Sequence, residues 1–149
     1  MCHFRDPRLD AVSSEEDFDL LGIILFGSSD KYAEKMLTST RAAVWAQGMR
    51  AEGAIIFTEG SGNNHVDYVN ACEQFGRRGI AVAGLTVLGK NGQFVVTNDY
   101  LDAIVDVCKS KGSVETCVLG ENNMTPADCR KALALLKLKM RKSDRKREL

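Results

Sequence analysis

Three short apolar runs alternate with two stretches of helical spacing, and this rhythm constrains the fold more than any other feature of the chain. The runs are 20–26 (LLGIILF), 54–57 (AIIF) and 80–85 (IAVAGL), and helical spacing covers 31–49 and 65–75. Continuous apolar runs of this length, rich in branched residues, are typical of strands that are buried on both faces. Strand, helix and strand in this order predict a parallel sheet with right-handed crossovers.

The expected fold class is therefore α/β, as a three-layer α/β/α domain around a mostly parallel, Rossmann-like sheet. The chain has 149 residues, which is enough for one domain with a sizeable core. We expect a single domain at 20–140, between an irregular N-terminal arm at 1–19 and a basic C-terminal tail at 141–149.

Two further strands and a last helix complete the predicted fold. The apolar segments 103–107 and 114–119 are interpreted as strands. The last helix is expected to begin at Thr125 and Pro126, where Asp128 completes a pattern close to the capping box.

Composition and charge exclude several classes of protein. The formal net charge is zero, and the basic stretch 137–147 has no interleaved aromatic residues, so we expect a solvated helix end and no nucleic-acid binding. No apolar run approaches the ~18 residues of a membrane span, and no apolar signal region is present at the N-terminus. The expected location is the cytoplasm, without membrane contact.

Cysteine usage indicates neither a disulfide framework nor a metal site. The number of cysteines is odd, and no C-x-x-C pair is present. Four of the five fall within helix or strand patterns and are interpreted as core thiols: Cys72, Cys108, Cys117 and Cys129. Cys2 differs, because it lies in the arm beside His3 and Arg5, where its thiolate would be stabilised. The alternative is that Cys2 is an incidental exposed thiol.

Candidate functional residues follow the first two apolar runs, because open parallel sheets bind ligands beyond the carboxyl ends of their strands. Glycines there let backbone amides approach a ligand, and the following helix N-terminus favours an anion. The complete dinucleotide fingerprint is absent. A tight strand-to-helix turn, a subunit interface and a small-ligand site all remain open. The candidate edge comprises Ser28, Ser29, Glu59, Gly60, Gly62, Asn63, Asn64, His65 and Asp67.

His65 is the one candidate acid or base at this edge, because the unperturbed pKa of histidine lies near neutrality. Only Glu59 and Asp67 are near it in sequence as partners. The alternative interpretation is a histidine in the first turn of a helix, in contact with solvent.

Several short segments occur in a fixed order along the chain, namely Gly22-Ile23-Ile24, KYAEKM at 31–36, GAII at 53–56, EGSGN at 59–63, Asp67 and Gly79-Ile80. This ordered set resembles a known family, that of the D-proline and glycine reductases. The similarity covers roughly 20–119 and is to the C-terminal, smaller half of their pyruvoyl precursor subunit.

The resemblance implies a role in the reductive cleavage of a C–N bond in an amino acid. In that family an internal cysteine of the precursor becomes a pyruvoyl group, which binds the substrate amine, and a selenocysteine-containing subunit takes part. Here only Cys2 stands where that cysteine would be, with Met1 alone before it. We therefore expect no cofactor of its own, and a pyruvoyl group only if Cys2 is processed.

The resulting hypothesis is a subunit or accessory protein of a D-proline-reductase-type complex, and we expect the protein to be an oligomer. Its expected partners include the selenocysteine-containing subunit and an amino-acid substrate. One alternative is a catalytic small subunit that uses Cys2 or a pyruvoyl group derived from it. Two more functions stay open, namely a non-catalytic assembly module and an unrelated small-ligand binder.

Overall fold

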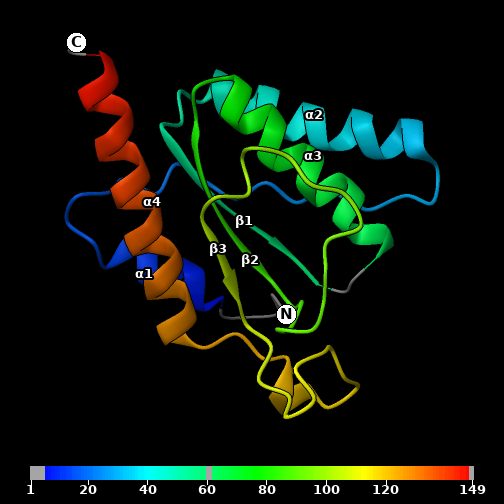
Figure 1. Cartoon of the computed structure of the whole chain (residues 1–149). Coiled ribbons are helices and arrows are strands. Elements are labelled where there is room, and N and C mark those ends of the chain that lie inside the picture. The colour runs from blue at the N-terminus through cyan, green and yellow to red at the C-terminus, as the bar shows by residue number, and fades with distance from the viewer. Residues whose placement is uncertain (1–5, 60–61, 148–149) are drawn as a thin grey trace.

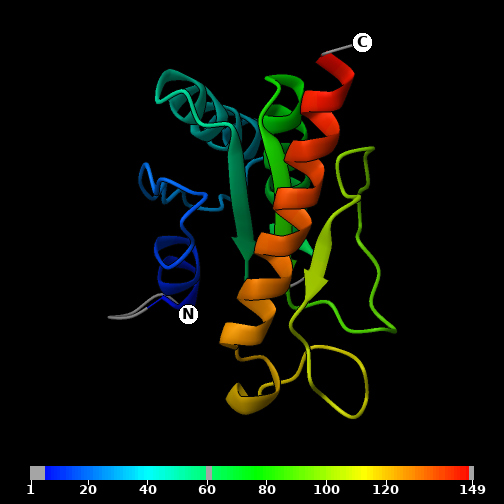
Figure 2. The same cartoon turned by 90° about the vertical axis from the view of Figure 1, so that its left-hand side faces the viewer.

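A three-stranded parallel sheet lies between two layers of helices (Figures 1 and 2). The computed structural model describes residues 6–59 and 62–147. Along the chain its elements are α1 (Pro7–Ser13), α2 (Tyr32–Gly48), β1 (Gly53–Thr58), α3 (Asn63–Arg77), β2 (Ala81–Thr86), β3 (Ile104–Asp106), the short 3-10 helix η1 (Leu119–Glu121) and α4 (Pro126–Arg147).

The strands follow the order β1-β2-β3, and both pairs are parallel. The register aligns Gly53 with Ala81 in the first pair and Gly84 with Ile104 in the second. Helices α2 and α3 cover one face of the sheet, and α4 crosses the other face with α1 beside it (Figure 2). The predicted α/β class, with a parallel sheet flanked by helices, is confirmed.

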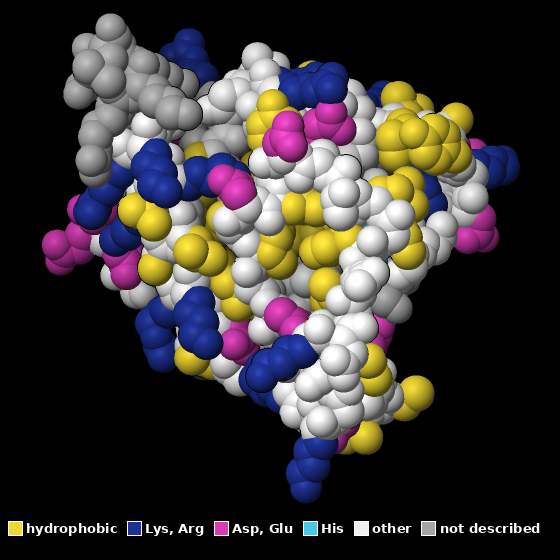
Figure 3. Space-filling model, viewed as in Figure 1, with side chains coloured by type: hydrophobic (Ala, Val, Ile, Leu, Met, Phe, Trp, Pro, Cys, Tyr) yellow, Lys and Arg dark blue, Asp and Glu magenta, His cyan; other side chains and the backbone are white. Residues whose placement is uncertain are grey.

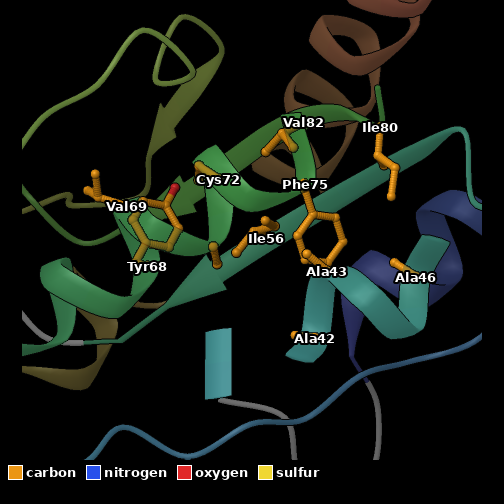
Figure 4. Packing of buried hydrophobic residues seen from close by; sticks show 11 residues of the cluster. Ala42, Ala43, Ala46, Ile56, Tyr68, Val69, Cys72, Phe75, Ile80 and Val82 are labelled. Carbon is orange, nitrogen blue, oxygen red and sulfur yellow. The ribbon is translucent and has the colours of Figure 1, made fainter. Parts of the chain in front are cut away.

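The main core cluster lies between the sheet and the helix pair α2–α3 (Figure 4). Alanines at 42, 43 and 46 form the buried side of α2, and these small side chains let α2 approach α3 closely. From α3, Tyr68, Cys72 and Phe75 recur at helical spacing and reach the sheet. On the opposite face, α4 buries Leu133 and Leu136.

The apolar run 20–26 does not form a strand, which corrects the first of the sequence predictions. It is an irregular segment beside β1, and Leu21, Ile23 and Leu25 are exposed. Ile24 and Phe26 are half-buried against the main core cluster. Apolar composition predicts burial, but it does not specify which strand the backbone will pair with. Ile24 and Phe26 are buried in part although the backbone of this segment forms no strand pairing with β1.

The strand predicted at 114–119 is also wrong. This segment turns and leads into η1, and Val114, Val118 and Leu119 are exposed. The hydroxyl of Thr116 donates a 2.7 Å hydrogen bond to Glu121, and its amide donates to Asn122. Such local side-chain bonds offer the backbone an alternative to a sheet ladder.

The N-terminal arm is not irregular throughout, because α1 forms within it. Asp6 caps this helix by accepting a 2.9 Å hydrogen bond from the amide of Arg8, and Pro7 occupies the first turn. Lys137 of α4 forms ion pairs with Glu15 and Asp17, which hold the arm against the domain. At the other end, α4 continues to Arg147, so most of the predicted basic tail is helical.

Candidate functional site

The predicted edge lies where β1 ends and α3 begins. Glu59 follows the strand directly, and Asn64 donates a 2.7 Å hydrogen bond from its side chain to the carbonyl of Glu59. Gly62 has φ of 64°, a left-handed conformation that favours glycine. Among the described residues, no side chain caps the first turn of α3, which begins at Asn63. The bond between Asn64 and Glu59 thus gives part of this loop the character of a tight strand-to-helix turn.

His65 is completely buried, so the alternative of a solvent-exposed first-turn histidine is wrong. Its ring packs on Phe94, with 4.7 Å between ring centroids and a 54° tilt. Within 6–59 and 62–147, neither ring nitrogen has a hydrogen-bond partner. Burial lowers the pKa of His65, and the negative charge of Glu115 opposes this shift only in part. The imidazole is therefore held in its neutral form.

A buried ion pair lies beside this edge and joins α2 to α3. The ammonium of Lys35 is 3.2 Å from a carboxylate oxygen of Asp67, and the two side chains are 3% and 4% exposed. Lys35 also donates a 2.7 Å hydrogen bond to the hydroxyl of Ser28. The polar contact continues along the helix pair, where Asn70 donates to Ser39. Two of the predicted residues, Ser28 and Asp67, thus contact one buried lysine.

Sequence reasoning missed Lys35, because a lysine within a helical pattern is usually exposed. One signal was present. Lys35 shares the spacing of Ser39, Ala42 and Ala46, which together form the buried stripe of α2. A lysine on such a stripe needs a buried partner, since an unpaired charge is too costly in a core.

A groove with a volume of about 720 Å³ runs between the segment 20–28 and the outer edge of β1. Its lining is mixed. Apolar side chains such as Phe26, Ile56 and Phe75 contribute, and so do charged side chains outside the predicted edge, namely Asp6, Arg8, Asp17, Asp19, Arg50 and Glu52. Four residues of the predicted edge also line the groove, and they are called its polar end here: Ser28, Glu59, Asn64 and Asp67. A groove that combines apolar surface with polar groups can hold a small molecule.

The remaining predicted residues do not join this polar end. Ser29 donates a 2.7 Å hydrogen bond to Glu34 and accepts one from the amide of Lys31, so it organises the start of α2. His65 lies behind the groove against Phe94, and it does not line the groove. Cys2 and Gly60 lie outside the described residues, and their predicted roles remain predictions.

The described thiols divide into two buried and two accessible groups. Burial raises the pKa of Cys72 to about 12 and that of Cys129 to about 11, which suits the predicted core thiols. Cys108 is half-buried and Cys117 is exposed, so the interpretation as a core thiol is wrong for Cys117. Within the part of the chain that the structure describes, no group of three or more histidine, cysteine or acidic residues is placed to hold a metal ion.

Charges of both signs are mixed on the face shown in Figure 3, with apolar side chains exposed between them. The basic stretch of α4 is partly neutralised within the fold. Lys137 pairs with the acidic arm, and Lys139 pairs with Asp102 and donates a 3.1 Å hydrogen bond to the carbonyl of Val82. Across the described ranges 6–59 and 62–147, no helix is both long and apolar enough to cross a membrane.

Comparison with known proteins finds one matching family and two similar proteins, all of them described as reductases or reductase components. The model of the family described as glycine/sarcosine/betaine reductase component B subunits matches residues 11–123. The D-proline reductase proprotein PrdA of Acetoanaerobium sticklandii is 40% identical over 135 residues, which are 91% of this chain and 22% of the relative. The glycine reductase complex component B subunits alpha and beta of the same organism are 26% identical over 106 residues, 70% of this chain and 24% of the relative.

The chain thus spans less than a quarter of the length of either relative. No solved structure matches the chain.

Proposed function

Because this chain belongs to the family of glycine/sarcosine/betaine reductase component B subunits, we propose that it is a subunit or accessory protein of a D-proline-reductase-type complex. Such a complex would cleave a C–N bond of an amino acid reductively. The observation that carries the proposal is the 40% identity over 91% of the chain with a D-proline reductase proprotein. The glycine reductase relative is less similar, at 26% over 70% of the chain, which favours the D-proline type.

We further propose that the chain works without a pyruvoyl group of its own. A cysteine that becomes a pyruvoyl group must end up at the N-terminus of a cleaved chain. Cleavage before Cys72 or Cys129 would cut α3 or α4, and cleavage before Cys108 or Cys117 would separate the sheet from α4. The described cysteines therefore do not fit this group, and Cys2 is the residue to test.

An unpartnered apolar surface on α2 supports a role in assembly. Within the described chain, Leu37 and Val44 are exposed on the side of α2 opposite its buried stripe, and Trp45 is exposed on the adjoining flank. Large apolar side chains on the outer face of a helix are typical of surfaces that contact another protein. This surface is the part of the chain that we expect to contact a reductase subunit.

Affinity capture from cells grown anaerobically with proline tests the proposal. The expected result is co-purification of a selenocysteine-containing reductase subunit in near-stoichiometric amount. Trp45→Lys should abolish this recovery, and Leu119→Lys is the matched control, because Leu119 is also exposed but lies on η1, a different element. Recovery of the tagged chain alone would contradict the proposal.

Intact-mass spectrometry tests the statement about the pyruvoyl group. The expected mass is that of the encoded chain, with or without Met1. A mass that shows loss of the Cys2 thiol, together with a terminus that reacts with phenylhydrazine, would instead favour the catalytic small subunit.

A second candidate function is binding of an amino acid at the polar end of the groove. The observation that favours it is the set of Ser28, Glu59, Asn64 and Asp67 in the groove lining, whose oxygens can accept hydrogen bonds from the amino group of an amino acid. Arg8 and Arg50, which also line the groove, supply the positive charge that a carboxylate needs. Isothermal titration with D-proline, L-proline and glycine tests this function, and heat from D-proline that persists in Asp67→Asn would exclude this location.

A further inference from the structure

The outer edge of β1 is open. Within the described chain, β1 pairs with β2 alone. The amide of Ala81 donates a 2.9 Å hydrogen bond to the carbonyl of Glu52. The backbone groups of Glu52, and of every second residue after it, therefore point toward β2. Since bonding alternates along a parallel strand, Gly53, Ile55 and Phe57 direct their N–H and C=O groups away from β2. Such an edge is a template for another strand.

The segment 20–26 has the pattern of the strand that this edge lacks. Over residues 23–26 the side chains alternate, because Ile24 and Phe26 pack against the main core cluster whereas Ile23 and Leu25 are 62% and 80% exposed. Before them, Leu20 and Leu21 are both exposed. Side chains that alternate between two sides are typical of an extended, pleated chain. Both sides are apolar here, as in a strand that is covered on both faces.

The segment also lies in the right place. Together with β1 it lines the groove of about 720 Å³, and it lies on the outer side of β1 without joining the sheet (Figure 2). A groove next to an open sheet edge, with α2 on one side and α4 on the other, has the surroundings of a strand position.

The direction of the segment matches that of β1. Phe18, just before the segment, packs in the same cluster as Met140, and Met140 lies close to Gly53 at the start of β1. Ser28, just after the segment, contacts Lys35 beside Asp67, near the end of β1. The connection through α2, on the same face as α3, then has the same right-handed sense as β1-α3-β2.

We propose that 20–26 is a strap that closes on the edge of β1 as a fourth parallel strand, giving the sheet order 20–26, β1, β2, β3. Closure replaces the groove with a ladder to Gly53, Ile55 and Phe57. It also fixes the Ser28–Ser29 loop beside the loop that follows β1, at the carboxyl edge of the sheet. The groove exists when the strap is open and is filled when the strap is closed. A molecule that binds in the groove would therefore stabilise the open state.

Amide hydrogen exchange measured by NMR on the full chain tests the strap. Closure predicts that the amides of Ile55 and Phe57 exchange at least ~10-fold more slowly than in the variant Leu25→Lys, because a strand covered on both faces cannot hold a charge at this position. The control Leu119→Lys replaces another exposed leucine and should leave both amides unchanged. Amides of Ala83 and Leu85 in β2 report that each variant is folded.

Two outcomes would overturn the strap. The first is equal exchange of Ile55 and Phe57 in the unsubstituted chain, Leu25→Lys and Leu119→Lys. The second is protection that rises with protein concentration together with a dimer in light scattering, since a second copy would then supply the strand. Neither outcome depends on the reductase partners, so the strap and the proposed function can fail separately.

Discussion

Removing the charge of Asp67 is the sharpest perturbation of the buried ion pair. At 3.2 Å and an effective dielectric constant of about 20, the attraction between the two charges is about 5 kcal/mol. The variant Asp67→Asn leaves the Lys35 ammonium buried beside a neutral amide, and breaking a buried pair in this way costs about 3–5 kcal/mol. We expect the midpoint of thermal unfolding to fall by about 6–20 °C, at about 2–4 °C per kcal/mol for a chain of this size. Urea denaturation gives the free energy directly.

Two further variants make this test specific to burial. Lys31→Met breaks the pair with Glu34, which has the same 3.2 Å separation but side chains that are 78% and 50% exposed, and it should not shift the urea midpoint. The double variant Lys35→Met/Asp67→Leu removes both charges and should recover most of the stability, because apolar replacement of a buried pair is often neutral. A loss below about 1 kcal/mol in Asp67→Asn would refute the reasoning.

Three more predictions concern single sites. Gly76→Ala in α3 would press a methyl group into the Tyr100 ring and should lower the free energy of unfolding by about 1–3 kcal/mol, whereas Gly48→Ala in α2 has open space and should raise it by about 0.5–1 kcal/mol; urea denaturation compares the two. Because burial lowers the pKa of His65, its contribution to stability is complete above the unfolded value of 6.5 and is lost as the pH falls below it. The free energy of unfolding should therefore be lower at about pH 5.5 than at about pH 7.5, and His65→Phe should reduce this difference. Thr125→Ala removes the hydroxyl that caps α4 and should lower the free energy of unfolding, measured by urea denaturation, by about 1 kcal/mol. An unchanged free energy of unfolding would contradict a stabilising role for the hydrogen bonds between Thr125 and Asp128.

Sequence patterns predicted the elements whose signals are local. The strands β1, β2 and β3 follow from apolar runs, and α2 and α3 follow from helical spacing between glycine-rich ends. The start of α4 was equally clear, because the hydroxyl of Thr125 and the carboxylate of Asp128 form the reciprocal bonds of a capping box. In each case neighbours in sequence carry the information.

The errors arose where distant residues decide the outcome. The run 20–26 has the composition of a buried strand, yet pairing with β1 depends on an edge about 30 residues away in sequence. One interpretation of the sequence placed His65 in the first turn of a helix, in contact with solvent, but Phe94 from a later loop packs on its ring. Lys35 was not predicted to be buried, although the spacing of α2 places it on the buried side, because the partner Asp67 belongs to another helix.

The single long helix α4 has a consequence for cooperativity. Two helices share one face of the sheet, but on the other face α4 is the one described helix that contacts all three strands. It also holds the N-terminal arm through Lys137. Detachment of α4 would expose that whole face and release the arm at the same moment, so its opening would cost nearly as much as unfolding of the whole domain. The first and last parts of the chain therefore belong to one cooperative unit, although 122 positions separate Glu15 from Lys137 in the sequence.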